Sequence, residues 1–561
     1  MQRHTLLFLV LWGILVSPVF LAAQQSGVTY RRISVAEYRD KMKAGWIGQI
    51  AGVTWGAPTE FRWQDKIIPA ADMPVWKPEM INDAFGQDDL YVEMTFLRTL
   101  EEYGLDVDIR QAGIDFANSE YPLWCANDAG RRNLRAGIAP PDSGHPQFNK
   151  CPNDIDYQIE ADYAGLIAPG MPNTVIALGQ KFGRLMNYSD GVYGGLFMGG
   201  MYAEAFFEDD IFKIIDAGLK CIPQDSQYAE MVCDVVSWYK ADPDDWEATW
   251  NLCQKKYRED PEYQKASNGG IDVKINGAYV LMGLLYGKGD LDKTIIISTR
   301  CGQDSDCNPS SSAGVLFATQ GFSKLPARFT EKLDMEKKFS FTAYNVPGLL
   351  DVCEKLARQI IIREGGRIEK DASGAEFFVI PVKAPVPPPL ELSWAPGPIA
   401  DSMFTDEERA QIRFKGFRTV VEAVESLFPG WTVKNCGLDM SPGKQEHFRG
   451  KKDVVMTHPL NRDVPCSLEI RQDIPTGKKT VLRVSVSNHP NYDWELVIRI
   501  NGSPQKTVVV DEALTKGRWA EVIFDLTPFA GSKNLQIELE NKANDWAFEA
   551  GYWSEIEIKS E

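Results

Sequence analysis

The chain has 561 residues, and its 60 Lys and Arg against 78 Asp and Glu give a formal net charge of −18. This length is several times that of a usual domain, so we expect at least two domains. The excess of acidic residues disfavours nucleic acid and anionic membranes as partners, because both require a basic protein surface.

Residues 1–23 have the pattern of a secretory signal peptide. A basic start at Arg3 precedes an apolar run from Leu6 to Leu21, which ends in Ala22 and Ala23. The run is shorter than the roughly 20 residues of a membrane-spanning helix, so we expect no stable membrane anchor. The sequence therefore predicts a secreted or periplasmic protein.

Residues 30–375 predict a mostly helical domain. In the segment DLYVEMTFLRTLEEYG, Leu90, Met94 and Leu97 lie on one helical face. The stretches GVYGGLFMGGMYAEAFF and KINGAYVLMGLLYG are apolar and rich in small residues, which favours closely packed buried helices. The run TIIIST at 294–299 is interpreted as a strand-like or buried segment.

Residues 376–400 predict a linker, because seven prolines fall between positions 381 and 398 and favour an extended, semi-rigid chain. Residues 401–561 predict an antiparallel, jelly-roll-like β-sandwich, although the piece from about 400 to 450 is not assigned to elements. The predicted strands are the runs CSLEIRQDI, TVLRVSVSNH, WELVIRING, KTVVVDE, WAEVIFDL, LQIELEN and WSEIEIK.

The sandwich carries aromatic residues that either stack on sugars or fill its core, and the sequence favours neither role over the other. They are Tyr492, Trp494, Trp546, Tyr552 and Trp553. The ten cysteines do not form a recognisable disulfide framework. Two pairs are candidate disulfides, namely Cys125 with Cys151 and Cys301 with Cys307.

Three segments of the helical domain combine glycine with acidic residues. GWIGQIAGVTWGAPTEF places Gly45, Gly48, Gly52 and Gly56 along one helix face and ends in Glu60. Such a glycine stripe favours close packing against another helix.

The two other segments each bring a pair of aspartates to the start of a helix. GQDDLYVEM has Asp88 and Asp89, and CGQDSDCNPSSSAG has Asp304 and Asp306. Helix capping alone explains one such pair. The four carboxylates together predict an oxygen-rich site for one or two Mg²⁺, Mn²⁺ or Ca²⁺ ions, which would orient sugar hydroxyls and activate water.

These three motifs resemble the ADP-ribosylglycohydrolase family, also called the ADP-ribosylation/crystallin J1 family, over residues 35–325. The resemblance implies an all-helical fold with a dinuclear Mg²⁺ or Mn²⁺ centre that cleaves ADP-ribose conjugates. It also implies that Asp88, Asp89, Asp304 and Asp306 are metal ligands. Glu60 falls on the acid that assists water or shields the metal.

The sequence departs from the family pattern at several positions. The Thr-Asp-Asp-Thr of the family is replaced here by Gln87, Asp88, Asp89 and Leu90, and the threonine after the last aspartate is Cys307. Val53 replaces an acid that is common in the glycine stretch. Gln87 has a carbonyl oxygen to offer a cation, whereas the Cys307 thiol is a poor ligand for Mg²⁺.

The segment CPNDIDYQIEADYAGLIAPG replaces the small residues and the arginine that the family usually has there. Its acids and amides suit a sugar better than a pyrophosphate, and a solvated acidic loop is the plain alternative. The predicted substrate-binding residues are Asn153, Asp154, Asp156, Gln158 and Glu160, with Trp124 and Tyr157 as ring contacts. Asp162 shares with Glu60 the predicted role in proton transfer.

Three functions remain open from the sequence. The first is a secreted, metal-dependent hydrolase of a ribosyl, furanosyl or related sugar linkage. The second is a true ADP-ribosyl hydrolase that acts on protein or small-molecule conjugates. The third is a carbohydrate-binding protein that has kept the fold and lost the chemistry.

Overall fold

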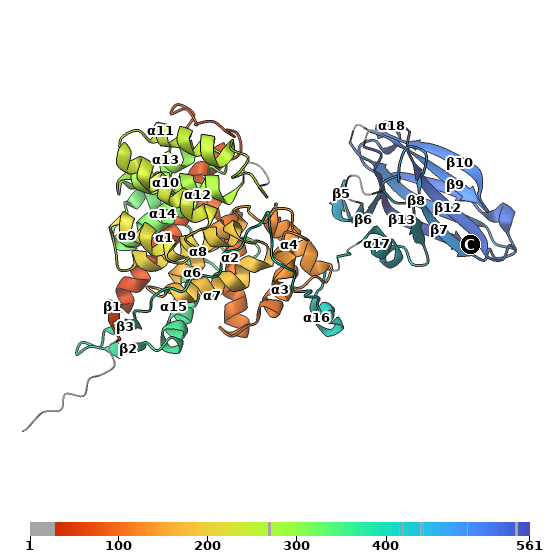
Figure 1. Cartoon of the computed structure of the whole chain (residues 1–561). Helices are drawn as coiled ribbons and strands as arrows, with labels where there is room; N and C mark the ends of the chain where they lie inside the picture. Colours follow the sequence, from red (N-terminus) through yellow and green to blue (C-terminus); the bar gives the residue numbers. More distant parts are fainter. Residues whose placement is uncertain are drawn as a thin grey trace, which may run out of the picture.

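The computed structural model describes residues 28–267, 271–414, 416–417, 419–437, 440, 442–490, 492–544 and 548–561. The predicted signal peptide lies outside these residues. Figure 1 shows a helical body followed by a separate β domain. Among the described residues, no helix has the length and apolar character needed to cross a membrane.

The helical body is built around one large apolar core. Its helices are α1 (Val35–Gly56), α2 (Asp88–Tyr103), α3 (Ile109–Ala117), α4 (Ala126–Arg135), α5 (Asp156–Ile159), α6 (Asp162–Leu166), α7 (Pro172–Phe182), α8 (Asp190–Ala205), α9 (Ile211–Leu219), α10 (Gln227–Ala241), α11 (Trp246–Cys253), α12 (Val273–Gly287), α13 (Leu291–Arg300), α14 (Cys307–Gln320) and α15 (Val346–Arg363). Short 3₁₀ turns η1 (Ala57–Thr59) and η2 (Pro78–Gly86) follow α1 and precede α2.

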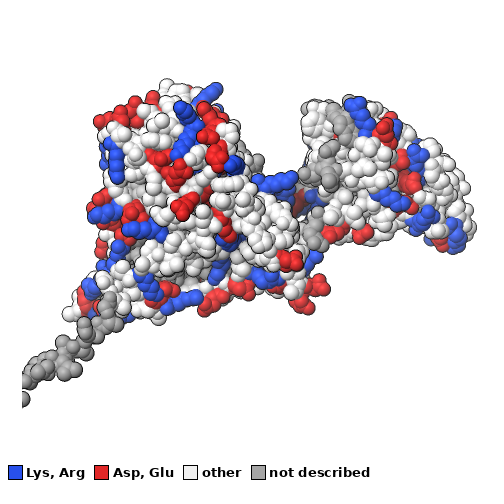
Figure 2. All heavy atoms as spheres, in the orientation of Figure 1, with Lys and Arg blue, Asp and Glu red and all other residues white. Residues whose placement is uncertain are grey.

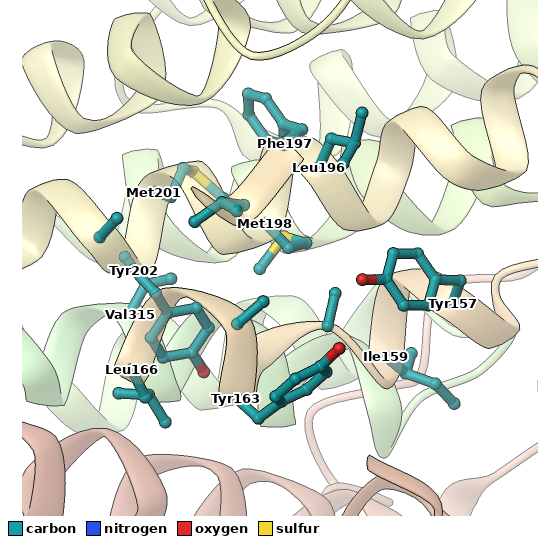
Figure 3. Close-up of a cluster of buried hydrophobic side chains, with 14 of the residues drawn as sticks. Tyr157, Ile159, Tyr163, Leu166, Leu196, Phe197, Met198, Met201, Tyr202 and Val315 are labelled. Carbon is teal, nitrogen blue, oxygen red and sulfur yellow. The ribbon is translucent and has the colours of Figure 1, made fainter. Parts of the chain in front are cut away.

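The centre of this core is lined by helices with little polar surface. In α8 and α12 almost every residue is buried, as their small, apolar sequences predict. Figure 3 shows Tyr163 of α6 and Tyr202 of α8 among the apolar side chains of this cluster. Asn276 of α12 accepts the Asp304 backbone N–H over 3.4 Å, so α12 contacts one of the acidic motifs directly.

The run TIIIST is helical and not a strand. It lies in α13, where the Asp290 side chain caps the helix by accepting a hydrogen bond from the Lys293 backbone N–H. Ile295 and Ile297 are buried on the face toward the core. The cap and the surrounding helices therefore override the strand preference of the β-branched residues.

A small antiparallel sheet joins the two ends of the helical body. Its strand order is β1 (Tyr30–Ser34), β3 (Glu376–Pro381) and β2 (Arg367–Lys370). The pairing of β1 with β3 places the beginning of the helical domain beside the chain that leaves α15. The proline-rich segment starts from this sheet.

The proline-rich segment is extended, and it is also attached to the surface of the helical body. The Ser189 hydroxyl donates to the Glu391 carbonyl over 2.6 Å, and the Ser393 hydroxyl donates to Asn153 Oδ1 over 2.6 Å. Farther along, Phe404 and Ile412 are buried in the helical core. Residues up to about 412 therefore pack with the helical body, which includes part of the piece left unassigned by the sequence.

The C-terminal domain consists of two antiparallel five-stranded sheets, with strand orders β10-β9-β12-β7-β4 and β11-β8-β13-β6-β5. Most consecutive strands from β6 to β13 lie in opposite sheets, as in a jelly roll, whereas β9 and β10 pair with each other within one sheet. All seven predicted strands are present. The helix α16 (Asp406–Gln411) precedes this domain and belongs to the part of the chain that packs with the helical body. The elements of the domain are α17 (Val420–Leu427), β4 (Thr432–Lys434), β5 (Gly443–Phe448), β6 (Lys451–Thr457), β7 (Cys466–Gln472), β8 (Thr480–Asn488), β9 (Trp494–Ile500), β10 (Ser503–Val510), α18 (Glu512–Thr515), β11 (Ala520–Asp525), β12 (Leu535–Lys542) and β13 (Gly551–Ser560).

Most of the aromatic residues singled out in the sandwich are buried in the interior of the domain. Trp494 of one sheet and Trp553 of the other are fully buried, with ring centroids 5.1 Å apart. Tyr552 is buried and stacks on Phe448. These three fill the domain interior, whereas Tyr492 is exposed. Trp546 lies outside the described residues.

The surface carries charges of both signs. On the face shown in Figure 2, Lys and Arg are interspersed with Asp and Glu over the helical body and the sandwich. Several carboxylates pair with arginine, for example Glu204 with Arg31 and Glu408 with Arg110.

Candidate active site

Helices α1 and α14 pack along the glycine stripe. A Cβ added to Gly52 would lie 2.2 Å from the carbonyl oxygen of Pro309, and one on Gly56 would lie 2.1 Å from that of Ser305. Only glycine allows the two backbones to approach so closely. This contact brings the end of α1, which leads to Glu60, beside the segment that carries Asp304 and Asp306.

The segment before α14 is fixed to the turn after α1. The Phe61 backbone N–H donates to the Gln303 carbonyl oxygen over 3.2 Å, and the Thr59 and Ser305 hydroxyls are 2.8 Å apart. Gly302 has φ +81° and would meet the Trp63 carbonyl oxygen if it carried a Cβ. These contacts set the direction of the Asp304 and Asp306 side chains.

The third acidic motif lies at the start of α2, where a helix N-terminus favours negative charge. Gln87 occupies the N-cap position and is half-buried, and Asp88 and Asp89 form the first turn. Asp89 is buried, and its Oδ2 accepts a weak hydrogen bond from the Cys307 thiol over 3.2 Å. The predicted pairing of Cys307 with Cys301 is not observed, because Cys301 lies against Trp250 and Tyr279.

The acidic residues of the three motifs converge. One group consists of Asp89, Asp306 and Cys307, and a second consists of Glu60, Asp304 and Asp306. Within each group the ligand atoms all lie within 4.8 Å of one another, and Asp306 belongs to both. Of the four predicted aspartates, Asp89, Asp304 and Asp306 belong to these groups, whereas Asp88, whose Oδ2 accepts from the Trp124 indole, belongs to neither.

Burial makes this cluster unfavourable when all its carboxylates are charged. Desolvation, with the charges of Asp306 and Asp88, raises the pKa of Glu60 to about 7. Desolvation and the nearby acids raise the pKa of Asp306 to about 6 and those of Asp89 and Asp304 well above their usual range. A cation would relieve this repulsion.

The donor atoms fit a divalent cation. Asp89 Oδ1 and Asp304 Oδ1 are buried, and neither has a hydrogen-bond partner. Orphaned carboxylate oxygens are costly unless a cation or a proton satisfies them. Carboxylates are the ligands that Mg²⁺, Mn²⁺ and Ca²⁺ prefer, so the residues present match the cation predicted from the sequence.

Aromatic residues lie next to the cluster. The Trp124 indole donates to Asp88 Oδ2 over 2.7 Å, while 65% of the residue surface stays exposed. Tyr91 lies one turn after Asp88 on α2 and contacts Phe341, which is 58% exposed. Trp124 thus presents an exposed ring beside Asp88, and Phe341 is a second exposed ring, which was not among the predicted residues.

The acid and amide run of 153–162 is buried, so it is not a solvated loop. Asp156 accepts hydrogen bonds from the Ala126 and Asn127 backbone N–H groups at the start of α4. Glu160 accepts one from the Asn127 side chain over 2.8 Å. These two acids hold the start of α4, which follows Trp124, and they support the site rather than line its surface.

Several predicted substrate contacts are corrected by this burial. Tyr157 is 1% exposed and packs against Gly183 and Gly195, so its predicted contact with a sugar ring is wrong (Figure 3). Asn153 and Gln158 are fully buried, where they accept hydrogen bonds from the Ser393 and Tyr228 hydroxyls. Both amides therefore belong to internal packing.

Asp154 and Asp162 are also internal. Asp154 is fully buried and its carboxylate lies beside Cys125 and Cys151 instead of the acidic cluster. Asp162 accepts hydrogen bonds from Gln49 and Tyr202. Burial raises the pKa of Asp162 to about 7.

A second layer of polar groups beneath Asp89 was missed by the sequence reasoning. Glu93 lies one turn after Asp89 on α2 and accepts the Tyr163 backbone N–H over 2.8 Å. Glu93 Oε1, Gln49 Oε1 and Asp162 Oδ1 are buried without a partner. A signal existed, because Glu93 is a lone acid within an otherwise apolar stretch of α2.

Comparisons with known proteins agree with the helical part of the chain. A family model described as ADP-ribosylglycohydrolase matches residues 34–366. A search of curated proteins found no match. One similar solved structure, "ADP-ribosylglycohydrolase-related protein complex", has 12% sequence identity and a TM-score of 0.37 and covers 58% of this chain and 99% of that chain.

A second solved structure is titled "A novel family GH115 4-O-Methyl-alpha-glucuronidase, BtGH115A, with specificity for decorated arabinogalactans". It has 10% identity and a TM-score of 0.17, and the match covers 69% of this chain and 41% of that chain. At these TM-scores neither structure bears on the substrate of this protein.

Proposed function

Because the chain belongs to the ADP-ribosylglycohydrolase family, we propose that it is an exported, metal-dependent hydrolase that cleaves a glycosidic bond of a furanosyl or related sugar. The observation that carries the proposal is the convergence of Glu60, Asp304 and Asp306 with Asp89 around buried, unpartnered carboxylate oxygens.

Asp89, Asp304 and Asp306 would hold the cation, with Asp88, Gln87 and the Cys307 thiol at its border. When bound, a divalent cation of the Mg²⁺, Mn²⁺ or Ca²⁺ class, as one or two ions, supplies positive charge that neutralises the acids and orients the hydroxyls of a sugar.

Glu60 is the best placed of the acids to transfer a proton. It is exposed at the end of η1, whereas Asp304 and Asp306 are buried. Carboxyl groups are among the side chains that serve as general acids and bases. We assign Glu60 to the proton transfer between the enzyme and water or the leaving oxygen. We assign Asp162 a supporting role in the buried polar layer beneath Asp89.

The substrate class is proposed from the rings at the edge of the cluster. Trp124 offers an exposed indole face beside Asp88, and an aromatic face is suited to packing on the apolar side of a sugar ring. The predicted signal peptide supports a substrate outside the cytoplasm. The jelly-roll domain, with Tyr492 exposed, is proposed to bind carbohydrate.

A second candidate is a hydrolase that removes ADP-ribose from a conjugate, which is favoured by the description of the matching family. Both candidates use the same acidic cluster. A carbohydrate-binding protein without activity is the remaining outcome, since Leu90 and Cys307 stand where the resemblance implies hydroxyl ligands.

The test is hydrolysis by the purified full-length protein in the presence of Mg²⁺, Mn²⁺ or Ca²⁺. We expect release of free monosaccharide from a panel of furanosides, and loss of that release in chelator. Cleavage of ADP-ribosyl peptides with no release from any glycoside would reject the sugar proposal in favour of the second candidate. Sugar binding without turnover under every metal condition would reject both hydrolases.

A further inference from the structure

A further group of possible ligand atoms shares no residue with the acidic cluster and contains two sulfur atoms. The Sγ atoms of Cys125 and Cys151 and a carboxylate oxygen of Asp154 all lie within 4.8 Å of one another. Cys125 is the N-cap residue of α4, and the other two belong to the loop before α5. Two segments of the chain therefore meet at these three side chains.

Asp154 is the member that calls for a ligand. It is fully buried, and among the described residues its carboxylate has no hydrogen-bond partner other than the Cys125 thiol, which is a weak donor. An isolated buried carboxylate is strongly unfavourable unless it is protonated or neutralised by a cation. One of its oxygens lies within 4.8 Å of both sulfur atoms, and a cation would sit between these three atoms.

The neighbouring buried acids, unlike Asp154, have charged or N–H partners that stabilise their negative charge. Asp272 forms a buried ion pair with Lys274 at 3.2 Å. Asp156 accepts backbone N–H groups at the start of α4.

We propose that Cys125, Cys151 and Asp154 form a binding site for a thiolate-preferring divalent cation of the Zn²⁺ class, with water in the remaining position. Thiolates favour Zn²⁺ over Mg²⁺ or Ca²⁺, and three protein ligands with one open position are an established arrangement for zinc. Binding releases the protons of both thiols and of Asp154. The site differs from the acidic cluster, whose oxygen ligands suit hard cations.

The position of this site gives it a structural consequence. Trp124 directly precedes Cys125, and its indole donates to Asp88. A cation that joins Cys125 to the loop of Cys151 would hold the start of α4 and, through it, the Trp124 ring. The site therefore stabilises one wall of the acidic cluster without taking part in its chemistry.

The test is a Co²⁺ titration of the reduced, chelator-treated full-length protein. We expect about one Co²⁺ per chain to produce a thiolate charge-transfer band in the near ultraviolet, and Zn²⁺ to abolish the band by displacement. Cys151→Ser and Asp154→Asn should each weaken Co²⁺ binding at least about tenfold. Cys233→Ser is the matched control, because Cys233 is exposed on α10 and should leave the band unchanged.

Asp304→Asn separates this proposal from the proposed function, because it removes a ligand of the acidic cluster and should leave the Co²⁺ band intact. Circular dichroism of each variant shows whether it has folded. The proposal is overturned if the reduced wild-type protein gives no thiolate band. It is equally overturned if peptide mapping of the native protein finds Cys125 and Cys151 joined in a disulfide.

Discussion

Asp304 combines burial, an unpartnered oxygen and close contact with two other acids, so its charge is costly in the absence of a cation. Asp304→Asn keeps the shape and removes the charge. Loss of a group that only supports a metal ligand costs about 10- to 100-fold, so we expect loss of this ligand to lower kcat/KM by more than about 100-fold. Thermal unfolding should show a more stable metal-free protein with little stabilisation by Mn²⁺.

The same measurement on Asp244→Asn provides a control. Asp244 is exposed and pairs with Lys288, outside both groups of ligand atoms. This variant should leave Mn²⁺ stabilisation and turnover close to wild type. Full activity of Asp304→Asn would remove this residue from the centre.

Trp124 is expected to act through its ring and through its N–H group, and two substitutions separate these effects. Trp124→Phe keeps a ring and loses the hydrogen bond to Asp88, whereas Trp124→Ala loses both. Ring packing is worth about 0.5–1.5 kcal/mol, so we expect Trp124→Ala to raise KM roughly 2- to 10-fold. Trp124→Phe should recover most of that loss in steady-state kinetics.

Phe212→Ala is the control for loss of an exposed ring, because Phe212 lies on α9, where it contacts Tyr239. We expect its KM to match wild type. An unchanged KM in Trp124→Ala would mean that the substrate does not contact this indole.

At the scale of elements, the contact of α1 with α14 positions the centre. Gly52→Ala would place a Cβ 2.2 Å from the Pro309 carbonyl oxygen, so the helices must move apart. Overpacking of this kind typically costs about 1–3 kcal/mol. We expect a lower midpoint in urea unfolding together with weaker cation binding, because Glu60 and Asp304 lie on opposite sides of the contact.

Gly397→Ala is the matched control. The nearest atom to its added Cβ is 3.6 Å away, so we expect a change in the free energy of unfolding within about 0.5 kcal/mol. Equal stability of the two variants would show that α1 and α14 tolerate a wider spacing.

The helix starts that carry the acids could be predicted from the sequence because each motif is local, whereas their convergence was expected from the set of motifs and from the family resemblance. Asp88 and Asp89 open a helix, and Asp306 precedes another, so short-range capping signals locate them. The burial of residues 153–162 was not predictable in this way. Whether Tyr157 faces a ligand or the glycines of α8 depends on helix packing between segments distant in sequence.

Glu93 and Gln49 illustrate the same limit at the centre itself. Each is a single polar residue within a helix, and a single polar residue carries no information about the partner it meets. Only the folded chain brings Gln49 to Asp162 and Glu93 to the backbone of Tyr163. The β-sandwich was more predictable, because alternating residues and turn glycines define its strands locally.

At the scale of the whole molecule, the two apolar cores are separate. The helical core ends with Phe404 and Ile412, and the sandwich core includes Ala423 and Val424 of α17. We therefore expect a chain truncated after residue 414 to fold and to hydrolyse small soluble substrates at the wild-type rate. Calorimetry of the full chain should show two transitions, of which the truncated form keeps one.

The truncation does break the ion pair between Arg135 and Glu446. Arg135 keeps its hydrogen bonds to the Ala117 and Ser119 carbonyl oxygens, so the loss should be small. A truncated chain that aggregates or unfolds without the sandwich would instead show that the sandwich stabilises the helical body.

The buried acids also give the whole molecule a dependence on pH when no cation is present. Burial raises the pKa of Asp162 to about 7, whereas a carboxyl group in the unfolded chain titrates near ~4. The native state therefore holds a proton that the unfolded state releases, and stability falls as pH rises through this window. We expect the free energy of unfolding, measured in chelator, to decrease between pH 4.5 and pH 7.5.

Asp162→Asn tests whether ionisation of Asp162 causes part of this decrease in stability. Asp162 faces Gln49, Tyr202 and the buried acid Glu93, and an amide at this position cannot ionise. The free energy of unfolding should therefore fall less steeply with pH in Asp162→Asn than in wild type. Asp115→Asn is the control, because Asp115 forms an ion pair with Arg98, and it should keep the wild-type slope between pH 5.5 and pH 7.5. Identical slopes in wild type and Asp162→Asn would mean that Asp162 is already ionised in the native protein, and the acid beneath the centre would then require its own buried counter-charge.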